Sequence, residues 1–306
     1  MTFLSLIAAL LVEQLRPLRP GNAVHLIYVR CVTQLETRFN GGSGEHGVVA
    51  WLLAVVPLVA VTAGIQFLLY HASPLLAWGW NVAVLYCTVG FRQFSHPYTQ
   101  ILQALQEGRL DGARACLTEW RGEPAVEESA NDIARVAIEE GLLRAHRHVF
   151  GPIASFIALG SAGAVLYRTA AMLSDRWGGR TDPEFGDFGR FAERFFFWLD
   201  WLPARATAAS FAVVGNFEDA VYCWLTQGRS WAMHTQSIIL SSGAGAIGVR
   251  LRAEGPAEAA EVRPEVGAGD EADVDYMRSA VGLIWRALVL WMALVLLVTV
   301  AYVLGR

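Results

Sequence analysis

Three apolar runs in this chain are long enough, or nearly long enough, to cross a lipid bilayer: residues 47–70, 74–91 and 281–304. A spanning helix needs about 20 predominantly apolar residues. Because the bilayer core offers no water to backbone N–H and C=O groups, such runs must satisfy these groups internally as helices. Only residues 71–73 separate the first two runs, which predicts a transmembrane hairpin over residues 47–93. Suitable interface anchors are Trp51, Trp78 and Trp80.

The composition agrees with a membrane protein that has sizeable polar parts. Of the 306 residues, 54% are hydrophobic and 17% are charged, whereas soluble domains carry roughly a quarter charged residues. All 24 basic residues are arginine, which excludes a P-loop lysine and a Schiff-base lysine. A formal charge of −4 provides no basic face for nucleic acid. The four cysteines lie far apart, so we expect neither a disulfide framework nor a metal site built on them.

We therefore expect an all-α, polytopic integral membrane protein with cytoplasmic helical segments, built as a single membrane domain over residues 1–306. Residues 2–12 are apolar but shorter than a span, and Glu13 ends this run, which we expect to be retained rather than cleaved as a signal peptide. Asp111 is expected to cap a helix, and Pro203 to interrupt one. Three segments follow from helical periodicity and hydropathy: an amphipathic helix at 24–39, a cytoplasmic helical segment at 94–148 with a loop at 122–128, and a central membrane segment at 149–227. After them we expect a cytoplasmic loop at 228–280, with a flexible acidic linker at 253–275, and a last transmembrane helix at 281–304.

The distribution of arginine predicts the orientation in a bacterial inner membrane. Residues 14–46, 92–148 and 228–280 hold many arginines, whereas the turn of the hairpin holds none. The positive-inside rule places the arginine-rich segments in the cytoplasm. The simplest arrangement has six crossings with both termini outside, but it also places the arginines of residues 174–194 outside. If residues 149–173 are re-entrant, the number of crossings falls to four.

An aromatic stretch, FGRFAERFFFWLDWLPAR at residues 188–205, surrounds Asp200 with phenylalanine and tryptophan. Such density is typical of a membrane–water boundary. A carboxylate there is costly unless it is paired or faces a cavity. Two interpretations remain open: an interfacial helix in which Asp200 pairs with Arg194 or Arg205, or a polar site at membrane depth.

Several segments, taken in order, carry a family resemblance. They are LQALQEGRLDGAR at 102–114 preceded by His96, ARVAIE at 134–139, GSAGAVLYR at 160–168, WLPAR at 201–205 and GAGAIGVRL at 243–251. Together they resemble the CobD/CbiB family of membrane proteins, which is associated with adenosylcobinamide-phosphate synthesis. The AmpE proteins, linked to β-lactamase induction, share parts of the pattern. The resemblance covers most of the chain and implies a role in cobalamin biosynthesis, with Mg-ATP as a reactant if the family's amide-forming activity is retained.

The departures from the family pattern bear on that activity. The family motif E-N-T-x-D-G falls on residues 143–148, which read LRAHRH, and N-T-L-D falls on 171–174, which read AMLS. The paired Asp of the family falls on Phe195 and Phe196, and the polar half before the glycine run reads TQSIIL. The lost acids and amides are groups suited to holding a magnesium-bound nucleotide or orienting an amine. Their loss, with the glycines and aromatics kept, indicates a retained scaffold with altered or absent chemistry.

The candidate binding residues are those that remain polar or conformationally special within these segments. Arginine guanidinium groups can bind an anion in a bidentate manner, although arginines near an interface also snorkel to it. The glycine run permits close approach of the backbone. Glu139 is a candidate ligand-binding residue, but it could instead lie on a solvated helix face, where it forms an i,i+4 ion pair with Arg135. His146 and His148, at i,i+2, share no helical face, so a basic collar toward lipid headgroups is favoured over metal ligation. The tentative ligand-binding set is His96, Glu139, Arg168, Arg194, Asp200, Arg205, Gly245, Gly248 and Arg250; no catalytic residue and no metal ligand is assigned.

Two functions from different classes follow from these observations. The leading one is a CobD/CbiB-like role in cobalamin biosynthesis, at the ATP-dependent step that joins a corrinoid carboxylate to an amino-alcohol phosphate. The alternative is a non-enzymatic, AmpE-like membrane sensor or scaffold. The expected partners are the lipid bilayer, a corrinoid or other anionic ligand, and a membrane protein or a second copy of the chain.

Overall fold

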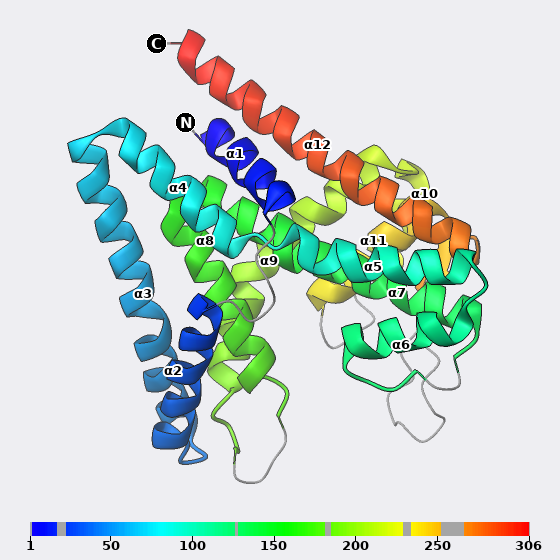
Figure 1. Cartoon of the computed structure of the whole chain (residues 1–306), viewed down its shortest axis with the longest axis horizontal. Helices are drawn as coiled ribbons and strands as arrows, with labels where there is room; N and C mark the ends of the chain where they lie inside the picture. Colours follow the sequence, from blue (N-terminus) through cyan, green and yellow to red (C-terminus); the bar gives the residue numbers. More distant parts are fainter. Residues whose placement is uncertain are drawn as a thin grey trace. The chain divides into compact units, whose positions relative to one another are not determined.

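The computed structural model describes residues 2–16, 23–125, 128–180, 185–228, 234–251 and 266–305, and these residues are predominantly helical (Figure 1). They form two compact units. The first comprises Met1–Gly90 and Gly151–Pro203, and the second comprises Phe91–Phe150 and Ala204–Arg306. Three of the described runs are long and apolar enough to cross a membrane: Gly44–Ala72, Ala130–Trp177 and Val274–Leu304. The expected all-α membrane fold is confirmed.

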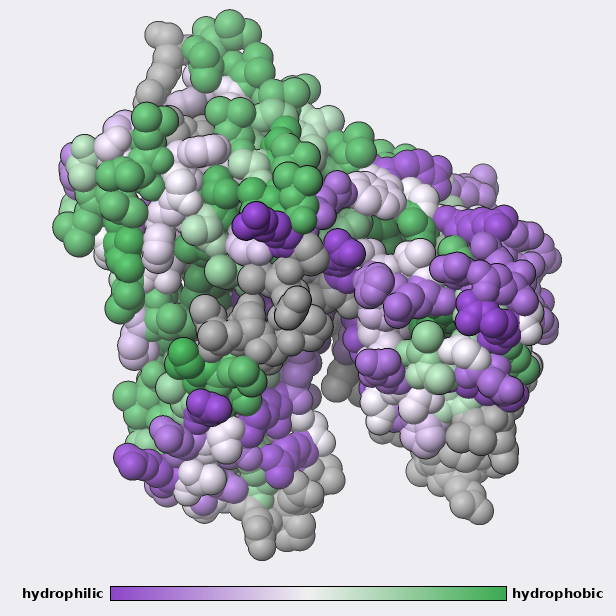
Figure 2. Space-filling model, viewed as in Figure 1, coloured by the Kyte–Doolittle hydropathy of each residue, from purple (hydrophilic) through white to green (hydrophobic). Residues whose placement is uncertain are grey.

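In the first unit, the predicted hairpin is present as α3 (Gly44–Ala72) and α4 (Pro74–Thr88). Ser73 joins them with extended backbone, and Pro74 opens α4 at a position where its missing N–H is not needed. Helix α1 (Thr2–Leu15) packs against α4, and α2 (Ala23–Phe39) packs against α3. Large apolar side chains such as Leu68 and Leu75 remain 67% and 73% exposed. Figure 2 shows hydrophobic surface along α3 and α4, as expected of helices that face lipid.

Helix α8 (Gly151–Trp177) reverses direction at Gly160, whose φ of 65° and ψ of −154° are not helical. This backbone conformation is accessible essentially only to glycine. A Cβ on Gly151 would lie 2.1 Å from the ring of Tyr167, and one on Gly163 would lie 2.2 Å from the carbonyl oxygen of Ser155. In a straight helix, Gly151 and Tyr167 would be about 24 Å apart. Residues 151–159 and 161–177 therefore lie side by side as a helical hairpin.

The short arm of this hairpin limits how the central segment can enter a membrane. Residues 151–159 rise only about 13 Å as a helix, which is less than half of a hydrocarbon core of about 30 Å. The run Ala130–Trp177 therefore qualifies as a span by length and composition, but its path turns back at Gly160.

The core of the first unit is rich in aromatic side chains near the C-terminal end of α8. Trp177 and Phe188 are buried with ring centroids 5.1 Å apart, and Phe185 lies 5.1 Å from Phe188. The backbone of Phe188 lies so close to Gly47 that a Cβ there would be 2.0 Å from the Phe188 carbonyl oxygen. This contact explains why the first turn of α3 contains a glycine at that position.

In the second unit, α5 (Phe91–Gln106), α6 (Leu110–Arg121) and α7 (Ala130–Ala145) form a helical group with a polar outer surface (Figure 2). A capping box formed by Ser129 and Asp132 begins α7, and Gly122 ends α6 in the left-handed conformation. The expectation that Asp111 caps a helix was wrong. Helix α6 begins earlier, so Arg109 occupies the cap position and Asp111 lies in the first turn.

The rest of the second unit contains two short helices, a small sheet and the last apolar helix. They are α10 (Phe217–Gln227), α11 (His234–Ile247), β1 (Val249–Leu251), β2 (Val266–Gly267), β3 (Asp270–Glu271) and α12 (Val274–Leu304). β1 pairs antiparallel with β2 and parallel with β3. Part of the predicted acidic linker, residues 253–265, lies outside the described residues. The expectation of a flexible linker was wrong for residues 266–271, because their backbone pairs with β1.

Candidate functional site

Asp200 lies on α9 (Arg190–Val214) and is only 4% exposed. The hydroxyl of Tyr167, on the long arm of the α8 hairpin, donates a hydrogen bond of 2.7 Å to Asp200 Oδ1. Tyr167 is fully buried, so this bond satisfies the carboxylate away from water. Helix α9 continues through Pro203, and the expected interruption of the helix there was wrong.

The family that the sequence resembles carries paired acids at two positions where this chain has phenylalanines. Both phenylalanines pack in the core. Phe196 is 6% exposed, and its ring lies 5.4 Å from that of Tyr167. Phe195 packs against Trp51 with ring centroids 4.3 Å apart. These positions therefore stabilise the packing of α9 on α3 and α8 and present no carboxylate.

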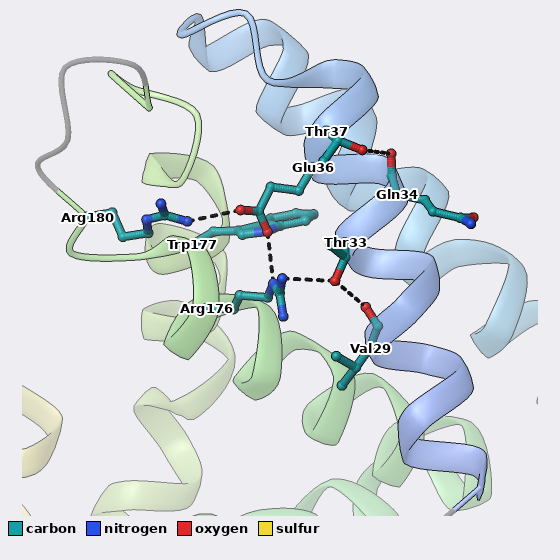
Figure 3. Close-up of polar contacts among 8 residues, drawn as sticks. All are labelled: Val29, Thr33, Gln34, Glu36, Thr37, Arg176, Trp177 and Arg180. Carbon is teal, nitrogen blue, oxygen red and sulfur yellow. Dashed lines mark hydrogen bonds and ion pairs between the residues drawn. The ribbon is translucent and has the colours of Figure 1, made fainter. Parts of the chain in front are cut away.

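A charged cluster joins α2 to the C-terminal end of α8 (Figure 3). Arg176 Nε donates to Glu36 Oε2 at 2.8 Å, and Arg180 Nη1 donates to Glu36 Oε1 at 3.0 Å. The indole N–H of Trp177 also donates to Glu36, at 3.2 Å, and Arg176 Nη2 donates to the Thr33 hydroxyl at 2.9 Å. Both oxygens of this carboxylate are thus bonded, which fixes α2 against the end of α8.

The cluster changes the acidity of Glu36. Partial burial favours the protonated carboxyl, but the hydrogen bond and charge of Arg176, with smaller contributions from Trp177 and Arg180, outweigh it and lower the pKa of Glu36. The ionised form is therefore the one that the folded unit stabilises. A doubly bonded carboxylate of this kind acts as a structural ion pair and offers no free oxygen to a metal.

His146 occupies the start of a π-helical turn, η1 (His146–Phe150), that follows α7. It is 2% exposed, and its Nδ1 lies 2.9 Å from the Thr207 hydroxyl. His146 therefore does not face outward, as a basic collar toward lipid headgroups would require. The π-turn is the irregular backbone that ligation by His146 and His148 would have required. Among the residues that the structure describes, however, no three His, Cys, Asp or Glu side chains gather to hold a metal.

The glycine run lies at the end of α11 and the start of β1. A Cβ on Gly245 would lie 2.6 Å from the Asp219 carbonyl oxygen, so this glycine permits α11 to pack closely on α10. Gly248 adopts a φ of 73°, which turns the chain from α11 into β1. Arg250 is exposed on β1 and lies in register with Glu271 on β3, so an anion bound by Arg250 would compete with a neighbouring carboxylate.

The remaining candidates lie in different surroundings. His96 is exposed on α5, with Nε2 3.3 Å from the side-chain nitrogen of Gln100, and Glu139 is half-buried on α7. Arg168 is half-buried on α8, Arg194 is exposed on α9, and Arg205 is half-buried. The candidate set is divided between the units: Arg168, Arg194 and Asp200 belong to the first, and His96, Glu139, Arg205, Gly245, Gly248 and Arg250 belong to the second.

Sequence reasoning missed three polar groups that the structure brings into contacts. Glu36 stands alone in an amphipathic segment, and its partners lie 140 and 144 positions away, so no spacing rule could have paired them. Thr207 follows the WLPAR segment and gave no signal as the partner of His146. The hydroxyl of Tyr167 as the partner of Asp200 could have been sought, because a buried carboxylate requires a donor.

A model of the CobD/CbiB protein family matches residues 6–284. The chain belongs to the CobD/CbiB family. It is 33% identical over 303 residues to a protein of Stutzerimonas stutzeri, covering 96% of this chain and 97% of the relative. It is 32% identical over 246 residues to a protein of Chromobacterium violaceum, covering 80% of this chain and 73% of the relative. Both relatives carry the name cobalamin biosynthesis protein CobD. No solved structure matches the chain.

CobD/CbiB membership extends over both units, because the matched residues begin in α1 and end in α12. The glycines and aromatics that carried the resemblance hold close contacts in the structure, as Gly245 does on α10 and Tyr167 does on Phe196. These segments therefore have packing roles that account for their residue types without reference to a ligand.

Proposed function

We propose that this CobD/CbiB protein works in cobalamin biosynthesis, at the step that joins a corrinoid carboxylate to an amino-alcohol phosphate. The observation that carries the proposal is the family match over residues 6–284. The names of the relatives from Stutzerimonas stutzeri and Chromobacterium violaceum agree with it. The assignment to the amide-forming step rests on what the family resemblance implies.

We further propose a bacterial inner-membrane location with four crossings, formed by α1, α3, α4 and α12. Two observations support four rather than six. The ion pairs of Glu36 with Arg176 and Arg180 hold the end of α8 against α2, which favours one side of the membrane for both. The reversal at Gly160 supports a re-entrant hairpin over residues 151–177. In the proposed arrangement, the arginines of residues 174–194 would lie on the arginine-rich, cytoplasmic side.

The anionic parts of the proposed reactants call for positive charge, and Arg168, Arg205 and Arg250 remain our candidates for binding them. Ligand-induced thermal shifts of the purified chain with a corrinoid carboxylate, compared with Arg205→Ala, test this assignment. A smaller shift for the variant is expected, and an identical shift in both proteins would contradict a role for Arg205.

The fit of the chain to Mg-ATP is poor at the positions where the family carries its acids. Phe195 and Phe196 are packed on aromatic rings, and Ser174, at the acid position of the N-T-L-D motif, carries no carboxylate. A magnesium ion bound to nucleotide phosphates still needs one or two protein carboxylates. We therefore derive no step of a mechanism through Mg-ATP.

The same observation favours a second candidate function, a non-enzymatic membrane scaffold or sensor of the AmpE kind. A chain that retains the packing residues and replaces the acids with core phenylalanines keeps the fold without the groups expected for catalysis. In this role the chain would bind a ligand or a partner membrane protein and leave the amide formation to another enzyme.

Complementation of a strain that lacks cobinamide-phosphate synthase separates the two functions. Growth that depends on this chain would support the amide-forming function. No growth, with the chain shown to be inserted in the membrane, would remove that function and leave the scaffold. Glu119→Gln, which alters an exposed carboxylate on α6, provides a control variant that should behave as the parent chain.

A further inference from the structure

A cavity of about 440 Å³ lies in the first unit, at the tip of the α8 hairpin. Its wall is formed by the C-terminal part of α3, by α4, by the first residue of α1 and by the residues on either side of Gly160. The polar lining residues are Thr2, Gln66, Tyr70, Asn81 and Ser161. The family resemblance assigned nothing to this place, and the proposed function does not use it.

Three polar atoms at this cavity are buried and lack a hydrogen-bond partner within the described part of the chain: Gln66 Oε1, Asn81 Oδ1 and Ser161 Oγ. Ser161 as a whole is 1% exposed. Each such group costs about 1–3 kcal/mol if it stays unsatisfied, and a lipid environment offers it no relief. Three of them, from three segments of the chain, converge on one cavity, which indicates a polar occupant that is not part of the protein.

The backbone at the cavity adds hydrogen-bond donors. Ser161 is the first residue of the long arm of the hairpin, residues 161–177. The first N–H groups of a helix have no acceptor within the helix and carry partial positive charge. Interrupted helices of membrane proteins form binding sites at such breaks. The break at Gly160 therefore places the start of a helix at the wall of the cavity that Gln66 and Asn81 also line.

The lining residues contain no Asp, Glu, His, Lys or Arg. A charged ligand would thus be buried without a counter-ion, which is strongly unfavourable. The two amide oxygens require donors, whereas the N–H groups at Ser161 require acceptors. A hydroxyl group supplies both, and adjacent hydroxyls can bridge the two sets. We propose that this cavity binds an uncharged polyol group, either of a free small molecule or of the glycerol headgroup of phosphatidylglycerol.

The test uses the full chain in lipid nanodiscs, with its four native cysteines replaced by alanine and with Asn81→Cys added, because Asn81 lines the cavity and is only half-buried. Labelling rates are measured with methanethiosulfonates that carry a hydroxyethyl, an anionic sulfonatoethyl or a cationic trimethylammonioethyl group. We expect the hydroxyethyl reagent to react about ten-fold faster than either charged reagent, relative to their rates with a free thiol, because a charge gains no partner in the cavity. Equal relative rates for the three reagents, or no reaction, would overturn the proposal.

A second measurement tests whether a bound polyol protects the introduced cysteine from labelling. Free glycerol in phosphatidylcholine nanodiscs represents the small-molecule source, and nanodiscs with added phosphatidylglycerol represent the lipid source. We expect one of the two to slow labelling by about three- to ten-fold, which corresponds to the free energy of about one hydrogen bond. Protection by glycerol identifies a free polyol, protection by phosphatidylglycerol identifies a headgroup, and protection by neither contradicts the proposal.

Two further variants complete the test, one as a control and one as an alternative probe. Thr62→Cys is the matched control, because Thr62 is a buried hydroxyl of α3 that donates to Leu58 O and does not line the cavity. We expect it to remain unlabelled, and rapid labelling there would show general accessibility rather than a cavity. If Asn81→Cys does not fold, Gln66→Cys on α3 probes the same cavity in the same way, and charge-independent or absent labelling of it would likewise refute the proposal.

Discussion

The Tyr167 hydroxyl and the Asp200 carboxylate form a 2.7 Å hydrogen bond between α8 and α9, with both side chains buried in the first unit. Tyr167→Phe removes this donor and keeps the ring. We expect it to lower the free energy of unfolding by about 1–3 kcal/mol, because a buried carboxylate loses a partner. Thermal unfolding in detergent measures the change. Tyr222→Phe, which alters a tyrosine that is 61% exposed on α10, is the control. Equal midpoints for the parent and Tyr167→Phe would contradict a stabilising role for the bond.

The close contact of the α8 arms predicts that Gly163 resists substitution. A Cβ there would lie 2.2 Å from the Ser155 carbonyl oxygen, so Gly163→Ala must push the arms apart, at a cost of about 1–3 kcal/mol. Gly64 on α3 has no atom within 4 Å of the corresponding position, and Gly64→Ala should stabilise its helix by up to about 1 kcal/mol. Opposite shifts of the unfolding midpoint are expected. A midpoint for Gly163→Ala at or above that of the parent chain would exclude the close hairpin.

The ion pairs of Glu36 predict a stability that depends on pH. The pKa of Glu36 is lowered in the folded chain, so its contribution is fully present above the pKa of the unfolded state, about 4.3, and is lost as the pH falls through the folded value. At pH 7, Glu36→Gln should destabilise the chain by about 1–2 kcal/mol, a range reduced for partial exposure. Below about pH 4 the difference from the parent chain should shrink. Unfolding midpoints across this range check the prediction.

The matched control for that series is Glu119→Gln, because Glu119 is an exposed carboxylate on α6. Its midpoint should follow the parent chain at every pH. A Glu36→Gln difference that is constant from pH 7 to the acid limit would show that the loss arises from packing rather than from charge.

Gln227 bonds both backbone groups of one residue in the sheet. Its Nε2 donates to Gly267 O at 3.1 Å, and its Oε1 accepts from Gly267 N at 2.7 Å. Gln227→Leu removes both bonds, so amide hydrogen exchange in residues 266–271 should accelerate by roughly thirty-fold, at about 1 kcal/mol for each bond. Mass spectrometry of peptides from this segment measures the effect. Gln103→Leu on α5, which removes an exposed contact to Glu107, should leave that exchange rate unchanged.

The apolar elements followed from the sequence because their length alone restricts them to helices. The α3–α4 hairpin and α12 lie close to the expected ranges. The reversal at Gly160 was left open as a re-entrant alternative, because a run of small residues permits both a straight helix and a close turn. The φ of Gly160 depends on the packing of Gly163 on Ser155, a contact that hydropathy does not encode.

The candidate site was less predictable, because its polar contacts join residues far apart in the chain. Asp200 was identified as a carboxylate that needs a partner, but Tyr167, 33 positions away, was not named as its donor. The strands around Arg250 were missed because two of them lie in a segment whose composition is typical of a linker. Local composition describes what a segment prefers alone, whereas β1 supplies the pairing that residues 266–271 adopt.

The reversal at Gly160 also bears on how the chain enters its membrane during synthesis. The residues at the turn, from Phe156 to Gly163, carry no charge, so the insertion machinery would not need to move an ion into the hydrocarbon region. Because the arms touch at backbone distance between Ser155 and Gly163, they can partition from the translocation channel as a preassembled pair. In the re-entrant arrangement that we propose, the hairpin would share its insertion energy between two arms, and the short arm would need no independent signal to enter the lipid.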